Sequence, residues 1–495
     1  MIPRMLGRGL FVLCASLIVW GQGGPTISED SIHEAPAISV PSSDTLKGAY
    51  ALLESQNFTE AAGDFALLAA ANPKSIEAQL GLVRALFQAK KFKAASHAGE
   101  SAVQQNPESA PIHAILADVY FREGLFDFAE REYKAALALE PQSGRAWIGL
   151  GRIYSIRSMP EDAKHAFEKA GESSPRVLSN WLAALPSPEQ LATYREYAIQ
   201  DEQPSGSGCE VSSSSSDHHS GNEEIPLTAI VDGNGYLHGE GVKTQMDGRQ
   251  HALLLLDTGA AGITIGSDLA TRAGIVPQSD RELHGIGGNG KTQGHTARIA
   301  RIRIGNLEIH NCMVQIAKEN KILSQDGIIG TDVFRRYLIT IDFGRRKLEL
   351  EDRDGPENTL KTTGDAEALI HAYEFAHLLL VQAKAGRDAS GLFVLDSGAN
   401  ANTISEELTS KVGGMVSSPR FIEGSAGIVN SAIATDSASL EIGSMNIDRQ
   451  TVATIDLSTL SKHLGTEVAG QIGFSALKNL CLRIDYQSGT VYLRR

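Results

Sequence analysis

The sequence has no excess of basic residues. Lysine and arginine number 45 against 59 aspartates and glutamates, which gives a net charge of −14. A nucleic-acid-binding protein normally carries a basic face, so this class is disfavoured and no nucleic-acid partner is expected. Hydrophobic residues make up 42% of the chain and charged residues 21%, as in folded globular domains. The length of 495 residues is enough for two to four such domains.

Cysteines are few and do not form the pattern of a disulfide-stabilised domain. Cys14 lies in the N-terminal apolar run, which leaves Cys209, Cys312 and Cys481 as an odd, widely spaced set. Cys312 and Cys481 lie in apolar, strand-like runs. We therefore expect both of them to be buried thiols.

Long apolar runs are missing beyond the N-terminus. Arg4 and Arg8 precede a short apolar run over residues 10–20, and small residues follow it. This pattern is typical of a signal peptide over residues 1–23, because the run is short for a membrane span. We expect an exported protein, periplasmic or secreted, with no stable membrane span after signal cleavage. An N-terminal membrane anchor is the alternative.

Common metal-binding and nucleophile motifs are also missing. The sequence has no G-x-S-x-G, H-E-x-x-H or paired C-x-x-C motif. His218 and His219 are adjacent, but they lie in a serine-rich stretch where solvated side chains are expected. The sequence therefore predicts no metal site and no cofactor.

What the N-terminal third does contain is a repeat of constant period. The repeat is marked by equally spaced prolines, by an alanine at a fixed distance before each proline and, in three copies, by an aromatic residue between the two: Pro73, Pro107, Pro141, Pro175, Ala61, Ala95, Ala129, Ala163, Phe65, Tyr133 and Phe167. Small residues let two helices approach closely, and aromatic residues fill the space between neighbouring hairpins. The pattern predicts stacked helix hairpins, because one hairpin cannot bury its own apolar face.

This repeat resembles the tetratricopeptide repeat over about residues 42–175. The fourth copy matches most fully, with a W-x2-L-G-x2-Y array that begins at Trp147. The resemblance implies an all-α helical-repeat solenoid over residues 42–200, capped by a helix at 176–200. Such arrays usually bind a protein partner or peptide segment in their groove. Residues 201–224 follow as a serine-rich linker, across which we expect few contacts.

From residue 225 onwards the sequence is typical of an all-β region, because short runs of Val, Ile and Leu alternate with glycine turns. This region is duplicated. An apolar strand leads into Asp257-Thr258-Gly259-Ala260, and the pattern recurs further along the chain as Asp396-Ser397-Gly398-Ala399. An apolar-apolar-Gly segment that ends at Gly330 recurs in the same order and ends at Gly473. We predict two β lobes, over residues 225–352 and 353–495.

Each Asp-Thr/Ser-Gly loop has features of a catalytic turn. Glycine permits a tight turn and the close approach of a second loop. The hydroxyls of Thr258 and Ser397 can bond across to the opposing loop. Gly330 and Gly473 are expected to pack beside the loops, where a side chain would collide.

These residues resemble the retropepsin-like aspartic proteases, in which two such loops meet on a two-fold axis. The resemblance implies that Asp257 and Asp396 form the catalytic pair, supported by Thr258, Gly259, Ser397, Gly398, Gly330 and Gly473. It also implies two flap hairpins over the substrate, at Gly285, Ile286, Gly287 and Gly288 in the first lobe and at Gly424, Ser425 and Ala426 in the second.

The implied activity is that of an aspartic-type endopeptidase, a hydrolase acting on protein or peptide. Two adjacent carboxylates cannot both ionise cheaply, so they share a proton. Ala260 and Ala399 follow the loops where many relatives carry a hydroxyl that stabilises the charged form, so we expect activity to extend towards neutral pH. Two alternatives stay open: a non-catalytic peptide-binding scaffold on a retired protease fold, and a site formed between two chains. Asp342 and Asp485 are also duplicated, but their turn context favours a structural role.

Overall fold

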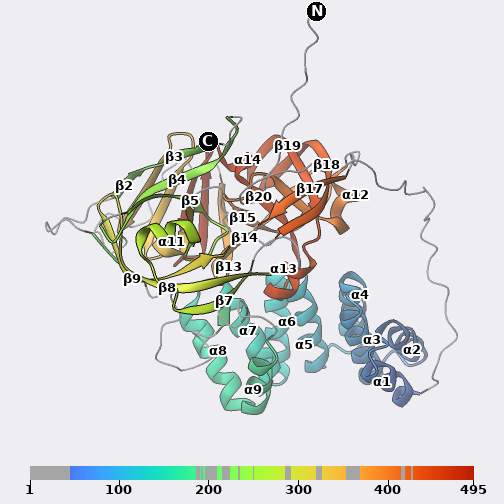
Figure 1. The fold of residues 1–495 in the computed structure, drawn as a ribbon. Helices are drawn as coiled ribbons and strands as arrows, with labels where there is room; N and C mark the ends of the chain where they lie inside the picture. Colours follow the sequence, from blue (N-terminus) through green and yellow to red (C-terminus); the bar gives the residue numbers. More distant parts are fainter. Residues whose placement is uncertain are drawn as a thin grey trace, which may run out of the picture.

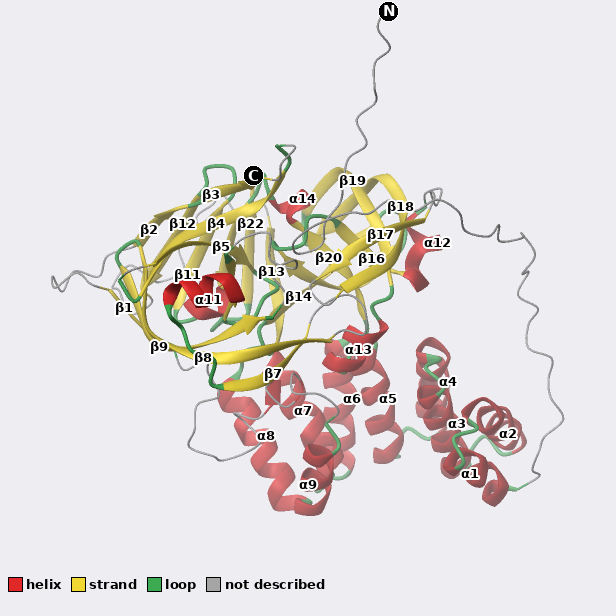
Figure 2. Ribbon diagram, viewed as in Figure 1, coloured by secondary structure: helices red, strands yellow, loops and turns green. Residues whose placement is uncertain are grey.

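The computed structural model describes residues 45–185, 190, 193–194, 209–213, 223–231, 235–248, 250–284, 291–318, 326–352, 368–413, 419–424 and 427–495. A helical array lies against one side of a larger β-rich region (Figure 1). Helix and strand segregate almost completely along the chain, as the colouring by secondary structure shows (Figure 2). The predicted signal peptide lies outside the described residues. In the part that is described, no helix combines the length and apolarity needed to cross a membrane.

The helical array consists of consecutive hairpins and one further helix. Its elements are α1 (Leu46–Glu54), α2 (Phe58–Ala71), α3 (Ile76–Gln88), α4 (Phe92–Gln105), α5 (Ala110–Arg122), α6 (Phe126–Leu139), α7 (Gly144–Ile156), α8 (Pro160–Ser173) and α9 (Pro175–Ala183). The second helices of successive hairpins begin at equal intervals, at Phe58, Phe92, Phe126 and Pro160. The predicted period of the repeat is therefore confirmed. Of the predicted capping helix, α9 is described and packs on α7 and α8.

Small residues at the helix contacts explain why the hairpins stack closely. The four repeated alanines are fully buried. A Cβ atom on Gly149 would lie 2.1 Å from the Tyr133 ring, and one on Gly81 would lie 2.2 Å from the Phe65 ring. Aromatic rings thus occupy the space that glycine leaves on the next hairpin, as the repeat pattern predicts.

The first lobe is built from strands with two short helical turns. Its elements are β2 (Glu223–Pro226), β3 (Thr228–Val231), β4 (Leu237–Met246), β5 (Gln250–Asp257), β6 (Ile263–Gly266), α11 (Ser267–Ala273), β7 (Ser279–His284), β8 (Lys291–Ile304), β9 (Leu307–Ala317), β10 (Gly327–Gly330), η1 (Thr331–Phe334), β11 (Tyr337–Asp342) and β12 (Lys347–Asp352).

The second lobe repeats this arrangement. Its elements are β13 (Ala368–Phe375), β14 (Leu378–Ala385), β15 (Ala389–Asp396), β16 (Asn402–Ser405), η2 (Glu406–Leu408), α12 (Thr409–Val412), β17 (Pro419–Gly424), β18 (Gly427–Ile442), β19 (Met445–Ile455), α13 (Ser458–Leu464), β20 (Val468–Gly473), α14 (Phe474–Leu477), β21 (Cys481–Asp485) and β22 (Thr490–Arg494).

Strand pairing shows that the two lobes share one topology. In the first lobe β10 runs parallel to β5 and antiparallel to β6, and β6 runs parallel to β9. In the second, β20 runs parallel to β15 and antiparallel to β16, and β16 runs parallel to β19. The predicted duplication is therefore present in three dimensions.

A shared sheet joins the two lobes through strands near the C-terminal end of each. Strand β11 of the first lobe pairs antiparallel with β21 of the second, with Ile339 opposite Ile484. Strands β12 and β2 extend this sheet on one side, and β22 and β13 extend it on the other. One buried hydrophobic cluster runs through both lobes and this sheet. The lobes are thus fixed relative to each other by backbone hydrogen bonds and by a common core.

Part of the expected serine-rich linker is built into the first lobe. Strand β1 (Glu210–Ser213) pairs antiparallel with β9, with Val211 opposite Ile309. This pairing brings Cys209 beside Cys312, and the two form a disulfide. The prediction that Cys312 is a free thiol is wrong, because 103 residues separate it from a partner that only strand pairing brings near. Cys481 is buried and free, as predicted.

The helical array docks on the second lobe, contrary to the expectation of few contacts. Phe126 at the start of α6 packs edge-on against Tyr373 of β13, with 4.6 Å between ring centroids. A buried cluster extends from the helices into β13, β14, β15 and β20. Helices α5 to α9 and the second lobe thus share one hydrophobic core.

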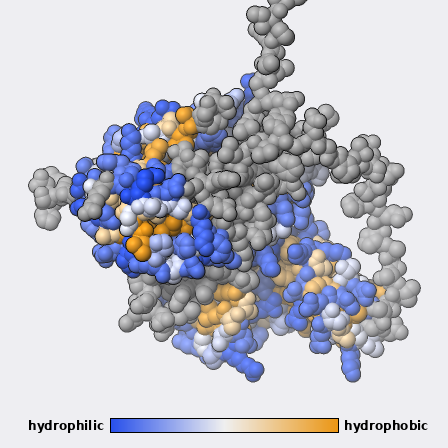
Figure 3. Space-filling view, viewed as in Figure 1, coloured by the Kyte–Doolittle hydropathy of each residue, from blue (hydrophilic) through white to orange (hydrophobic). Residues whose placement is uncertain are grey.

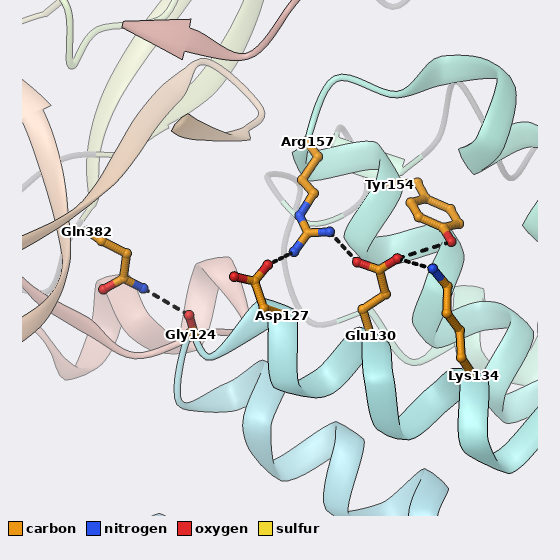
Figure 4. A network of polar contacts seen from close by, with 7 residues as sticks. All are labelled: Gly124, Asp127, Glu130, Lys134, Tyr154, Arg157 and Gln382. Atoms are coloured by element: carbon orange, nitrogen blue, oxygen red, sulfur yellow. Dashed lines mark hydrogen bonds and ion pairs between the residues drawn. The ribbon is translucent and has the colours of Figure 1, made fainter. Parts of the chain in front are cut away.

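Polar contacts line the same interface. Arg122 at the end of α5 forms an ion pair with Glu467 at 2.7 Å and donates to the Ser461 carbonyl at 2.9 Å. Gln382 of β14 donates to the Gly124 carbonyl at 3.0 Å. Figure 4 shows this last contact beside the network in which Arg157 contacts Asp127 and Glu130. The serine-rich composition of the linker indicated few contacts between the helices and the lobes, and this expectation is wrong.

Candidate active site

The two Asp-Thr/Ser-Gly loops meet between the lobes within one chain. Strand β5 ends at Asp257 and β15 ends at Asp396, and both carboxylates are almost fully buried. The backbone N–H of Gly398 donates to Oδ1 of Asp257 and to Oδ1 of Asp396, at 3.1 Å in each case. One donor can serve both only if the carboxylates are adjacent. The two aspartates singled out from the sequence therefore lie in one site.

The hydroxyls of Thr258 and Ser397 lock the loops together. Thr258 Oγ1 donates to the Leu395 carbonyl at 2.8 Å and accepts from the Ser397 N–H at 2.9 Å. Ser397 Oγ returns the pattern, donating to the Leu256 carbonyl and accepting from the Thr258 N–H, both at 3.0 Å. These buried bonds give the predicted cross-loop link, and their symmetry follows from the duplication.

Glycine is required where the apolar-Gly segments pass the loops. Gly330 pairs with Asp257 and Gly473 with Asp396 in the parallel ladders. A Cβ atom on Gly330 would lie 2.3 Å from the Ala260 carbonyl oxygen, and one on Gly473 would lie 2.3 Å from that of Ala401. Gly259 has the same constraint, since its Cβ would lie 2.8 Å from Asp396 Cγ. The close packing expected from the sequence is present in both lobes.

Burial and mutual repulsion dominate the electrostatics of the pair. Burial raises the pKa of Asp396 well above its ordinary value, and the neighbouring Asp257 carboxylate raises this pKa further. Backbone N–H groups of Ala399 and Gly398 act in the opposite direction, because they donate to the charged form. Ionisation of Asp396 is therefore disfavoured while the adjacent Asp257 carries a charge.

One residue at the site was missed by sequence reasoning. The side-chain amide of Gln471, in β20, donates to Oδ2 of Asp396 at 2.9 Å. Its counterpart in the first lobe is Ile328. Each of these two residues pairs with the aspartate-bearing strand two positions before the packing glycine. A polar residue inside an otherwise apolar landmark was the available signal.

The predicted flaps coincide with two hairpins whose tips are not described. Strands β7 and β8 pair as far as His284 opposite Lys291, and β17 and β18 pair as far as Gly424 opposite Gly427. Gly424 therefore ends a strand. The flap residues Gly285, Ile286, Gly287, Gly288, Ser425 and Ala426 lie outside the described residues.

Other acidic residues have structural partners. Asp342 accepts from the Arg345 N–H, and Asp485 accepts from the N–H groups of Gln487 and Ser488, so both close turns as expected. Asp332 accepts from the Gly262 N–H, and burial raises the pKa of its carboxyl group. Within the described ranges, no three His, Cys, Asp or Glu side chains are grouped so as to hold a metal ion.

Comparison with known families matches both halves of the chain. Residues 52–119 and 116–176 each match a tetratricopeptide-repeat model. Residues 242–336 match the family described as "gag-polyprotein putative aspartyl protease". The chain carries tetratricopeptide repeats followed by an aspartyl protease-like domain. This is the layout predicted from the sequence.

The aspartyl protease-like match lies within the first lobe. Asp257 falls inside the matched residues, whereas Asp396 falls outside them and enters the site through the duplicated topology. A search among curated proteins found no match to the chain. Solved structures similar to it include a thermophilic TPR protein in Thermus thermophilus and MamA. Each is 24% identical with a TM-score of 0.25 over 27% of this chain, and the match covers 75% and 78% of those chains respectively.

Proposed function

We propose that the protein is an aspartic endopeptidase whose catalytic pair, Asp257 and Asp396, is formed within one chain. The observation that carries this proposal is the shared Gly398 N–H, which holds both buried carboxylates side by side. The two buried acids themselves support it, because a pair of adjacent carboxyl groups is costly to bury and a non-catalytic scaffold would have no need of it. A site formed between two chains is disfavoured, because both loops already meet in this one.

The chemistry follows from one proton shared by two carboxyl groups. The ionised carboxylate takes a proton from a bound water, and the water oxygen forms a bond to the peptide carbonyl carbon. The protonated partner donates to the carbonyl oxygen and stabilises the tetrahedral intermediate. Collapse of this intermediate breaks the C–N bond as the first carboxyl group passes the proton taken from water to the amine nitrogen. Both carboxyl groups then return to their starting state.

The helical array is proposed to bind a protein, either the substrate itself or a separate partner. It exposes several large apolar side chains: Leu67, Ile76, Leu125, Phe128, Leu139, Met159 and Val177. Hydrophobic patches over the helices are visible on the face drawn in Figure 3. Export to an oxidising compartment is proposed as well, and the Cys209–Cys312 disulfide supports it.

The test is peptide cleavage by the chain without residues 1–23, between about pH 3 and pH 8, using a mixed peptide library. We expect cleavage at internal bonds, blocked by a pepstatin-type inhibitor that occupies the carboxylate pair. Peptide binding without cleavage at any pH would favour the non-catalytic scaffold instead. Cleavage that resists the inhibitor and survives loss of either aspartate would show that another site is responsible.

A further inference from the structure

Strand β20, which runs beside the Asp396 loop, begins at the surface of the helical array. The strand ends at Gly473, opposite Asp396 in the parallel ladder with β15. The two residues just before it, Thr466 and Glu467, both contact the last turn of α5. The helices therefore hold the chain at one end of a strand whose other end lies in the candidate active site.

Main-chain and side-chain bonds fasten this segment to α5. The Glu467 N–H donates to the Arg122 carbonyl at 2.8 Å, and the Thr466 hydroxyl donates to the Phe121 carbonyl at 3.1 Å. The Arg122 guanidinium pairs with Glu467 and also donates to the carbonyl of Ser461 in α13. The Ser461 hydroxyl in turn accepts from the first N–H of β20 at 2.9 Å. Because Thr466 and Ser461 are almost fully buried, loss of these bonds would leave buried polar groups without a partner.

The turn that follows α5 also packs on β15, the strand that ends at Asp396. Gly124 in this turn has a positive φ of 73°, and a Cβ atom there would lie 2.7 Å from the Leu392 side chain. Leu392 pairs with Val468, and the ladder between β15 and β20 is irregular directly after this pair. The bond from Gln382 to the Gly124 carbonyl fixes the turn on β14 (Figure 4). Helix α5 and its turn thus contact both strands that meet at the second aspartate.

The first lobe secures the equivalent strand from within itself. Asp326 immediately precedes β10, and its carboxylate accepts from the Leu253 N–H at 2.9 Å and forms an ion pair with Arg272 of α11 at 2.7 Å. Ala469 takes the place of Asp326 in the second lobe, because the glycine after each of them pairs with the equivalent position of β5 or β15. An alanine side chain can form neither bond. In the second lobe, the bonds from α5 lie at this end of the strand instead.

We propose that Arg122 and Thr466 are positioning residues through which α5 holds β20, and with it the Asp396 loop, in place for catalysis. The helical array is then part of the catalytic unit and not a detachable recruitment module. Without these bonds, the start of β20 can shift relative to β15. A small displacement of a reacting group lowers turnover more than it weakens substrate binding. The catalytic role rests on the proposed function, whereas the ordering of β20 by α5 does not depend on turnover.

The test combines amide hydrogen exchange with turnover of a short peptide, in the full chain without residues 1–23. Thr466→Val removes the buried donor and keeps the shape of the side chain, whereas Thr466→Ser keeps the donor. Arg122→Met removes the ion pair and the bond to α13. Arg145→Met is the matched control, because it breaks an arginine ion pair with Asp118 inside the helical array.

The expected changes are confined to the second lobe. In Thr466→Val and Arg122→Met, exchange over residues 468–473 should become about tenfold faster, because bonds at the start of β20 are lost. In the same variants kcat should fall by about tenfold, while KM changes by less than about twofold. Exchange over residues 327–330 should stay as in the wild type. Thr466→Ser and Arg145→Met should resemble the wild type in both measurements.

Three outcomes would overturn the proposal. Unchanged exchange over residues 468–473 in both variants would mean that α5 does not order β20. Exchange that rises equally over residues 327–330 would mean that the substitutions loosen the whole molecule. Faster exchange in β20 with unchanged kcat would mean that its order does not position the aspartate. If Thr466→Val does not fold, Arg122→Met decides. A wild type without peptidase activity would instead reject the proposed function, and the exchange pattern alone would then support or refute the ordering of β20 by α5.

Discussion

The two lobes have one topology but different surroundings. The first carries the Cys209–Cys312 disulfide and the added strand β1 on its outer edge. The described residues of the second have neither feature, but this lobe shares a hydrophobic core with the helical array. Each lobe is thus supported from outside the duplicated unit, one by a covalent link and the other by docked helices.

Close to the aspartates, the two lobes differ only at single residues. Thr258 and Ser397 form matching bonds, and Gly330 and Gly473 make matching close approaches. Gln471 and Ile328 differ, as do Ser475 and Asp332. Duplication thus preserves what both loops need to meet, whereas other positions beside the loops have diverged.

Loss of either aspartate should be equally severe despite the asymmetry around them. Asp257→Asn and Asp396→Asn should each lower kcat by on the order of 10³-fold or more, because a single carboxyl group cannot exchange the proton. Circular dichroism and thermal unfolding should show that both variants remain folded. Near-normal turnover in one of them would mean that the pair does not act as a unit.

Loss of the ring that joins the helices to the second lobe should destabilise the protein far more than loss of an exposed ring nearby. Phe126→Ala should lower the free energy of unfolding by about 3 kcal/mol, because this fully buried ring packs on Tyr373 and Phe375. Phe128→Ala, two residues further on, removes a ring that is 46% exposed and should cost much less. Denaturant unfolding measures both. Equal effects would mean that the array is only tethered to the protease-like lobes.

A methyl group on Gly330 and one on Gly473 should have equal effects, each in its own lobe. Gly330→Ala and Gly473→Ala should each destabilise the protein by about 1–3 kcal/mol, since the new Cβ meets backbone that cannot move away cheaply. Peptide cleavage should fall in parallel, because the same backbone carries the aspartate loops. Thermal unfolding and turnover measure both effects. A variant with unchanged stability and turnover would mean that the loop in that lobe does not approach its glycine.

Hydroxyls added after the loops should affect the lobes unequally. A serine that donates to the carboxylate favours its charged form and lowers its pKa, so the acid limb of the pH–rate profile should move to lower pH. Ala260→Ser should shift the limb by about half a pH unit. Ala399→Ser should shift it less, because Asp396 Oδ2 already accepts from Gln471. Equal shifts, or shifts to higher pH, would contradict this account.

Local sequence patterns predicted the elements that repeat. The constant period of the prolines and alanines located every helix hairpin, and the two Asp-Thr/Ser-Gly loops located both aspartates, because each pattern expresses a steric need at a fixed spacing. Partners set by long-range packing could not be predicted in this way. Cys312 lies beside Cys209 only through the pairing of β1 with β9, and Phe126 meets Tyr373 across the fold.

The central claim is that two lobes of one chain form a single active site. The most direct measurement is peptidase activity in an equal mixture of refolded Asp257→Asn and Asp396→Asn chains, compared with the wild type under the same conditions. We predict activity in the wild type and none in the mixture, because each variant chain keeps only one carboxyl group in its site. Activity that recovers in the mixture would show that the catalytic pair forms between chains and would contradict the account.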